Sequence, residues 1–186
     1  GAGNHFARLE CGPAGAPALL LGSHLDSVPS GGRYDGALGV LAALETLRAI
    51  KESDLELPFH LEAVDFSDEE GARYSPDMLG SLVHVGGLAL EEALDIVAAD
   101  DGARLGDELA RIGYAGPAPC PTNRAPHAFV ELHIEQGPVL GLFGRGFEGP
   151  VEGPVGGDRC CGVAEYCEAA VDGEVGAAAE YVAERG

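Results

Sequence analysis

The first 140 residues alternate between the apolar spacing of strands and that of helices. The short apolar run "ALLLG" (18–22) ends at a glycine, which is typical of a buried strand. Over 37–51, apolar residues recur at three- and four-residue spacing, which predicts a helix with one apolar face. That face consists of Val40, Leu41, Leu44, Leu47 and Ile50. We therefore expect a buried strand followed by an amphipathic helix.

The same alternation continues through the middle of the chain. "FHLEAVDF" (59–66) alternates behind Pro58 and predicts a second strand, and "AFVELHIEQ" (128–136) predicts a third. Helices are expected over 77–85, 90–99 and 103–112, and a proline-rich link follows at 116–126. Strands that alternate with helices indicate an α/β fold, in which helices pack on a sheet.

Composition changes after Leu140. Residues 141–186 contain 11 Gly in 46 positions, and "EGPVEGPV" (148–155) is a tandem repeat. A weak helical period runs from Val163 to Val182, but glycines interrupt it. We expect two parts, a folded domain over 1–140 and a glycine-rich tail over 141–186 that is disordered or at most one loose helix.

The charge balance excludes two classes of partner. Asp and Glu number 31 against 11 Lys and Arg, which gives a net charge of −20, and Lys51 is the only lysine. Such a field repels nucleic acid and anionic membranes, so neither is expected as a partner. Acidity with so little lysine favours a halophilic protein, because concentrated salt screens the self-repulsion. A GC-rich genome that prefers Arg, Ala, Gly and Asp remains the alternative.

Cysteine usage indicates a cytoplasmic protein with free thiols, since the five cysteines are an odd number. Three of them, Cys160, Cys161 and Cys167, crowd the tail. The adjacent pair lacks the two- to four-residue gap of a zinc knuckle, so a cysteine metal site is not favoured there.

Metal-capable side chains stand at the carboxyl ends of all three predicted strands, where α/β sheets bind their ligands. They are His24, Asp26 and Asp35 after the first strand, Glu69 and Glu70 after the second, and His133 in the third. Each residue alone has a simpler explanation, such as a structural histidine, a turn aspartate or a helix cap. The set as a whole predicts a Zn²⁺ or Mn²⁺ hydrolytic site, for which imidazole and carboxylate are the usual ligands.

Three motifs carry a resemblance to a known family. "GSHLDSVPSGGRYDGALGVLAALE", "FSDEEGARY" and "VELHIEQGPVL" together resemble the M20-type metal-dependent amidohydrolases. The resemblance is greatest to their hydantoinase/carbamoylase branch, the N-carbamoyl-L-amino-acid hydrolases and allantoate amidohydrolases. It covers residues 1 to about 140 and implies a partial catalytic domain with a mixed central sheet flanked by helices.

The resemblance also implies roles for individual residues. His24 and His133 would bind one ion, Glu70 the second, and Asp35 both. Glu69 would be the general base that activates water, and Asp26 would orient the His24 ring. An Asp35–Gly36 cis peptide is a further implication. The reaction implied is hydrolysis of a ureido or amide C–N bond in a small molecule, with two divalent metal ions.

Departures from the family pattern leave alternatives open. The family's lid domain, which forms its homodimer, and its last metal-binding histidine have no counterpart here, so no substrate-binding residue is carried over. We expect one well-held ion and no turnover from this chain alone. The chain is then either an enzyme of this branch seen as a fragment, or a truncated or frameshifted remnant without catalysis. A module that binds metal through His24, Asp35 and His133 is the third possibility.

Overall fold

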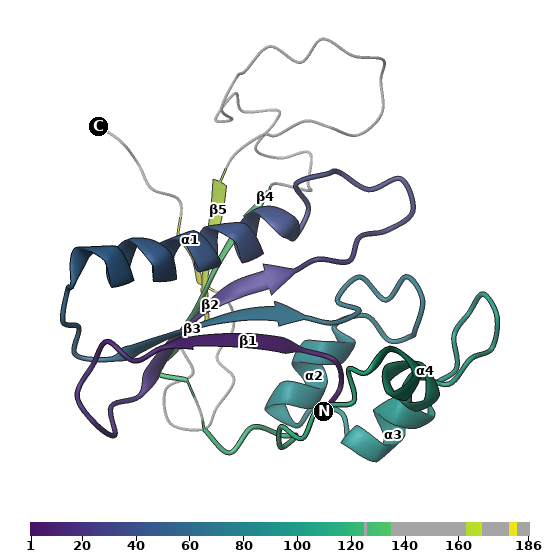
Figure 1. Cartoon of the computed structure of the whole chain (residues 1–186). Helices are drawn as coiled ribbons and strands as arrows, with labels where there is room; N and C mark the ends of the chain where they lie inside the picture. Colours follow the sequence, from purple (N-terminus) through teal and green to yellow (C-terminus); the bar gives the residue numbers. More distant parts are fainter. Residues whose placement is uncertain (125, 135–162, 169–178, 182–186) are drawn as a thin grey trace, which may run out of the picture.

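The computed structural model of the chain describes residues 1–124, 126–134, 163–168 and 179–181. Its strands form one mixed sheet in the order β1-β3-β2-β4-β5-β6 (Figure 1). The strands are β1 His5–Leu9, β2 Ala18–His24, β3 His60–Phe66, β4 Ala128–Ile134, β5 Val163–Glu168 and β6 Ala179–Tyr181. The helices are α1 Ala37–Ser53, α2 Leu79–Val85, α3 Leu90–Asp95 and α4 Leu105–Ile112. The predicted α/β fold with a mixed sheet is confirmed.

Three parallel strands form the centre of this sheet. β2 pairs in parallel with β3 on one side and with β4 on the other. β1 and β5 add antiparallel strands outside them. The carboxyl ends of β2, β3 and β4 therefore lie along one edge of the sheet, as the sequence requires for a shared site.

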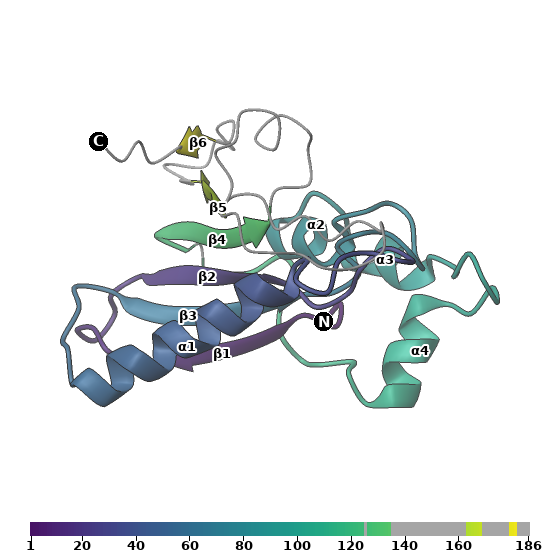
Figure 2. The ribbon, with the colours of Figure 1, turned by 90° about the horizontal axis from the view of Figure 1, so that it is seen from above.

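Helix α1 covers one face of the sheet, as Figures 1 and 2 show. Its Ala43 and Leu47 pack on Leu61 and Ala63 of β3, and these four residues are buried together. The alternate residues of the strands point to the other face, where Leu20, Val64 and Phe66 form a second buried cluster with Phe129 against it. This alternation is the period of two that strands impose on side chains.

Helices α2, α3 and α4 gather beside the carboxyl ends of β2 and β3 (Figure 2). They share a third buried cluster, which also takes in the N-terminal segment of the chain. Its members are Ala2, Tyr74, Leu79, Val83, Ala93, Ala98, Leu105 and Leu109. This cluster fixes the position of the segment that follows β3 and carries the acidic motif.

Most predicted elements are present, with two differences in the folded part. The strand β1 was not predicted, because "HFARL" is a mostly exposed edge strand without a clear apolar alternation. The helix predicted over 90–99 ends at Asp95, since Ile96 is extended and Val97 pairs with Arg104 in an antiparallel bridge. The chain thus turns back around 100–102 before α4 begins.

Strands β5 and β6 lie within residues 141–186, the predicted tail. β5 pairs with β4 from Phe129–Glu168 to Ile134–Val163, so residues 163–168 form a strand and not part of the expected helix. Residues 135–162, 169–178 and 182–186 lie outside the described residues, and Cys160 and Cys161 are among them. The domain boundary at Leu140 stays a prediction.

The backbone at Asp35–Gly36 differs from the expectation. Among the described residues, the cis peptide bonds are Ser75–Pro76 and Cys120–Pro121, so the expected cis bond at Asp35–Gly36 is wrong. Gly36 instead makes the sharp turn with a positive φ of 64°.

Within the described segments, none of the helices has the length and apolar character that a membrane crossing requires.

Candidate metal centre

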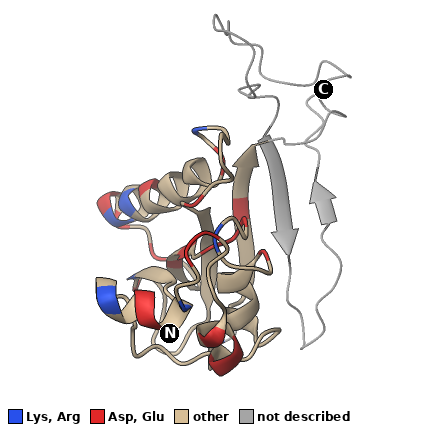
Figure 3. Ribbon diagram, turned by 90° about the vertical axis from the view of Figure 1, so that its right-hand side faces the viewer, with Lys and Arg blue, Asp and Glu red and all other residues tan. Residues whose placement is uncertain are grey.

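The predicted ligands converge at the carboxyl edge of the parallel strands. Figure 3 looks onto this edge and shows acidic segments among its loops. His24 ends β2, His133 lies near the end of β4, and Asp35 precedes α1. These three residues form the one group among the described residues whose His, Cys, Asp or Glu ligand atoms are close enough to hold a metal ion.

The distances within this group fit a single divalent ion. His133 Nε2 lies 3.2 Å from Asp35 Oδ1, and the Nε2 atoms of His24 and His133 are 3.4 Å apart. His24 Nε2 is 4.0 Å from Asp35 Oδ1. Two donors that each lie about 2.1 Å from one ion are at most about 4.2 Å apart. All three separations meet that limit, so one ion can reach all three atoms.

Hydrogen bonds to the opposite ring nitrogens prepare both histidines as ligands. Nδ1 of His24 lies 2.8 Å from the backbone oxygen of Asp26, and Nδ1 of His133 lies 2.9 Å from that of Ile134. A carbonyl only accepts, so each Nδ1 carries the proton and donates it. Each Nε2 then keeps its lone pair for a metal, which is how protein histidines are usually oriented for ligation.

Asp35 reaches the group because the chain after β2 folds back on itself. The loop over 25–35 returns to His24, and α1 starts directly behind it at Ala37. His24 and Asp35 are 4% and 6% exposed, so both are buried. A bound divalent ion would offset the cost of burying the Asp35 carboxylate.

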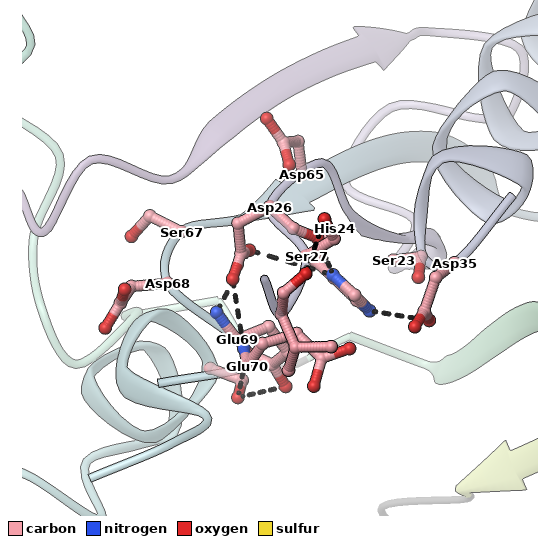
Figure 4. Close-up of polar contacts among 12 residues, drawn as sticks. Ser23, His24, Asp26, Ser27, Asp35, Asp65, Ser67, Asp68, Glu69 and Glu70 are labelled. Carbon is pink, nitrogen blue, oxygen red and sulfur yellow. Dashed lines mark hydrogen bonds and ion pairs between the residues drawn. The ribbon is translucent and has the colours of Figure 1, made fainter. Parts of the chain in front are cut away.

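Asp26 contacts both the His24 ring and the turn after β3, through different atoms (Figure 4). Its backbone oxygen holds the His24 ring, while its carboxylate lies 3.7 Å from Nδ1. The carboxylate instead accepts hydrogen bonds from the backbone N–H groups of Glu69 at 3.1 Å and Glu70 at 3.0 Å. Asp26 therefore ties the turn after β3 to the end of β2.

The Glu69 carboxylate is bonded to Ser81 of α2 and is not a member of the three-residue group. The hydroxyl of Ser81 lies 2.9 Å from each of its carboxylate oxygens. Burial raises the pKa of the Glu69 carboxyl, and the Ser81 hydrogen bond partly offsets that rise. A carboxyl with a raised pKa that is not itself a ligand is a stronger base than an ordinary carboxylate, as a general base requires.

Glu70 lies beside Asp35 rather than within the three-ligand group. Burial raises the pKa of the Glu70 carboxyl, and the neighbouring Asp35 carboxylate raises it further. Two carboxylates that repel each other in this way are a common feature of sites that hold cations between them. The sequence-predicted assignment of Glu70 to a second ion is compatible with this placement and stays a prediction.

Three supporting residues were missed at the sequence level. Ser81 holds Glu69, Ser23 is bonded to Glu131, and the Asn4 amide bridges the turn after β3 to α2. Asn4 Oδ1 accepts from the backbone N–H of Ser67 at 3.0 Å, and its Nδ2 donates to the Gly80 carbonyl at 2.9 Å. Nothing in the local pattern marks these residues, because their partners lie far along the chain.

The sequence comparison decides the family. The model of peptidase family M20/M25/M40 matches residues 20–181. This chain belongs to that family. The M20 match includes all six predicted site residues, and it extends past Leu140.

Two curated relatives and one solved structure illustrate the similarity. An N-carbamoyl-L-amino acid amidohydrolase of Geobacillus stearothermophilus is 42% identical over 142 residues, 75% of this chain and 34% of the relative. An allantoate deiminase of Arabidopsis thaliana is 35% identical over 173 residues, 84% of this chain and 31% of the relative. A hydantoinase/carbamoylase family amidase from Burkholderia vietnamiensis superposes with a TM-score of 0.73 at 45% identity, over 77% of this chain and 34% of that one. The chain thus spans about a third of the length of these M20-family relatives.

Proposed function

We propose that this chain is the metal-binding part of an amidohydrolase that hydrolyses a ureido or amide C–N bond, with an N-carbamoyl-L-amino acid or an allantoate-type compound as substrate. The observation that carries the proposal is the convergence of His24, Asp35 and His133 within bonding distance of one ion. The names of the relatives in the M20 family support the class of bond.

The donor set selects the type of ion. Two neutral imidazole nitrogens and a carboxylate oxygen suit Zn²⁺ or Mn²⁺, and no thiolate takes part in the described group. Such an ion would polarise the substrate carbonyl and make water more acidic. A second ion would take Glu70 and share Asp35, as the family resemblance implies.

The contacts of the remaining site residues support the roles that the family resemblance implies. Glu69 takes a proton from the attacking water and delivers it to the leaving nitrogen, because its carboxyl is buried, has a raised pKa and is held by Ser81. Asp26 orients the His24 ring by its backbone oxygen and aligns the Glu69 turn by its carboxylate. The base and the ligand group are therefore positioned by one residue.

A second candidate function is binding of one metal ion without catalysis. The observation that favours it is that the described ligand group has three members and fits one ion. Three protein ligands suffice to hold a zinc ion, whereas hydrolysis with two ions needs further ligands.

Metal loading and ammonia release separate the two functions. The 186-residue chain is loaded with Zn²⁺ or Mn²⁺ and incubated with an N-carbamoyl-L-amino acid and with allantoate. We expect one ion per chain and no turnover from the chain alone. Metal-dependent ammonia release that is absent in Glu69→Gln would show that this third of the family's length suffices for catalysis.

The catalytic role is tested in a chimera. Residues 1–134 replace the matching part of the Geobacillus stearothermophilus relative, which supplies the remaining length. The chimera should release ammonia from an N-carbamoyl-L-amino acid, and its Glu69→Gln variant should lose turnover while keeping its metal content. A Glu69→Gln chimera with unchanged turnover would refute Glu69 as the base.

A further inference from the structure

A partly buried side-chain bridge joins β2 and β4, the two strands that carry His24 and His133. The hydroxyl of Ser23 in β2 donates a hydrogen bond to Oε1 of Glu131 in β4. Ser23 is only 1% exposed and directly precedes His24. Glu131 lies two residues before His133 in β4. Neither residue has a part in the proposed chemistry.

The register of the sheet sets the two histidines level with each other. The last parallel pair between β2 and β4 is Leu21–Val130, with a sequence offset of 130 − 21 = 109. His24 and His133 have the same offset of 109. They are therefore opposite each other, three residues beyond the last pair (24 − 21 and 133 − 130).

Backbone pairing does not span this last part of the two strands. Beyond Leu21–Val130, no further pair joins β2 to β4 among the described residues. β2 stays paired with β3 as far as His24–Phe66, so the position of His24 is fixed from that side. The Ser23–Glu131 bond lies in the interval between the end of the β2–β4 ladder and the two rings, whose centroids are 5.6 Å apart.

We propose that Ser23 and Glu131 are positioning residues that set the separation of the His24 and His133 rings and thereby the metal affinity of the site. A hydroxyl bonded to a carboxylate is among the stronger hydrogen bonds in proteins. Water cannot replace it readily at a side chain as buried as Ser23. The inference rests on the proposed function, since it assigns the bridge a task at that metal site.

The variants are chosen to separate the hydrogen bond from the charge. Ser23→Ala removes the donor and keeps the Glu131 charge, whereas Glu131→Gln removes the charge and keeps an oxygen that can accept the bond. Glu131→Ala removes both. Ser27→Ala is the control for loss of a hydroxyl close to His24 in the sequence, because Ser27 follows His24 by three residues and its hydroxyl lies 3.4 Å from the Val28 carbonyl, outside the bridge.

Two readouts are made on each folded 186-residue variant. The first is the nuclear Overhauser effect between the His24 and His133 rings in metal-free protein. The second is a Co²⁺ titration followed by the d–d absorption bands, whose energy and intensity report ligand geometry. Loss of partners that orient metal ligands typically weakens metal binding by about 10- to 100-fold.

The variants that lose the Ser23–Glu131 bond should differ from those that keep it. Ser23→Ala and Glu131→Ala lose the ring-to-ring signal, bind Co²⁺ about 10- to 100-fold more weakly and show shifted d–d bands. Glu131→Gln and Ser27→Ala stay close to the wild type in all of these. If the alanine variants keep both the ring contact and the Co²⁺ spectrum, the inference is wrong. A loss in Glu131→Gln beside an unchanged Ser23→Ala variant would also overturn it, because the charge and not the hydrogen bond would then be responsible.

The inference can fail separately from the proposed function. If the wild-type chain binds no Co²⁺, the proposed function fails, while the ring contact in metal-free protein still decides whether the bridge positions the histidines. A rapidly exchanging Ser23 hydroxyl proton in the wild-type chain would overturn the inference without any variant.

Discussion

Replacing Gly36 by alanine should damage both the fold and the metal group, because this glycine lies against the His24 imidazole. Gly36 has φ 64° and ψ −47°, a combination that side chains with a Cβ rarely adopt. A Cβ there would stand 2.5 Å from both Cε1 and Nδ1 of His24 and would also collide with the His24 backbone oxygen. Either the α1 start or the His24 ring would have to move.

The expected loss of stability in Gly36→Ala is the sum of a backbone contribution and a packing contribution. A backbone held in such a region costs about 1–3 kcal/mol. Forcing a methyl group into a packed site costs about another 1–3 kcal/mol. Gly36→Ala should therefore lower the free energy of unfolding by about 2–6 kcal/mol, which is a large share of the stability of an ordinary domain, about 5–15 kcal/mol.

Urea unfolding and Zn²⁺ titration measure the two consequences. Gly102→Ala is the control, because Gly102 also has a positive φ of 72° but has no atom within 4 Å of an added Cβ. It should lose only the backbone contribution, about 1–2 kcal/mol, and keep its Zn²⁺ affinity. If Gly36→Ala loses no more stability than Gly102→Ala and binds Zn²⁺ equally well, the close packing of Gly36 on His24 is refuted.

Three further predictions concern Asn4, Asp65 and the net charge of the chain. Asn4→Ala should lower the free energy of unfolding, measured in urea, by about 1–3 kcal/mol, because it leaves the Ser67 N–H and the Gly80 carbonyl without their partner. A loss smaller than that of the exposed control Asn123→Ala would contradict this prediction. Burial raises the pKa of the Asp65 carboxyl above its unfolded value, so the charged form costs stability. The stability of the wild type relative to Asp65→Asn should therefore be highest below about pH 3.9 and fall as pH rises through the folded pKa, and a difference that grows with pH in urea unfolding would refute this. The melting temperature should rise from low salt to molar KCl because the net charge of −20 repels itself in the compact state, and a flat or falling curve would count against adaptation to salt.

The sequence predicted that His24, Asp35 and His133 lie close together, for a physical reason. His24, Asp35 and His133 are far apart along the chain, but each follows or ends a strand, and the ends of parallel strands share one edge. Apolar periodicity locates those strands reliably because β2 and β3 are largely buried. The convergence seen at this edge is thus a consequence of strand order.

The supporting residues could not be predicted in the same way. Ser23, Ser81 and Asn4 are single polar residues whose function depends on partners brought close only by the fold. Asp26 shows the same limit. The family resemblance implies that it orients the His24 ring but does not specify the atom, and its backbone oxygen lies closer to that ring than its carboxylate does. Edge strand β1 also escaped prediction, since its exposed side chains lack a clear apolar pattern.

The most direct test of the metal centre is a calorimetric titration of Zn²⁺ into the metal-free 186-residue chain. We expect about one tight site per chain, lost in His24→Ala and in His133→Ala. His84→Ala should retain it, because that histidine packs on Phe6 and Phe66 away from the ligand group. A wild-type chain that takes up no Zn²⁺, or single variants of His24 and His133 that bind it as tightly as the wild type, would contradict the assignment.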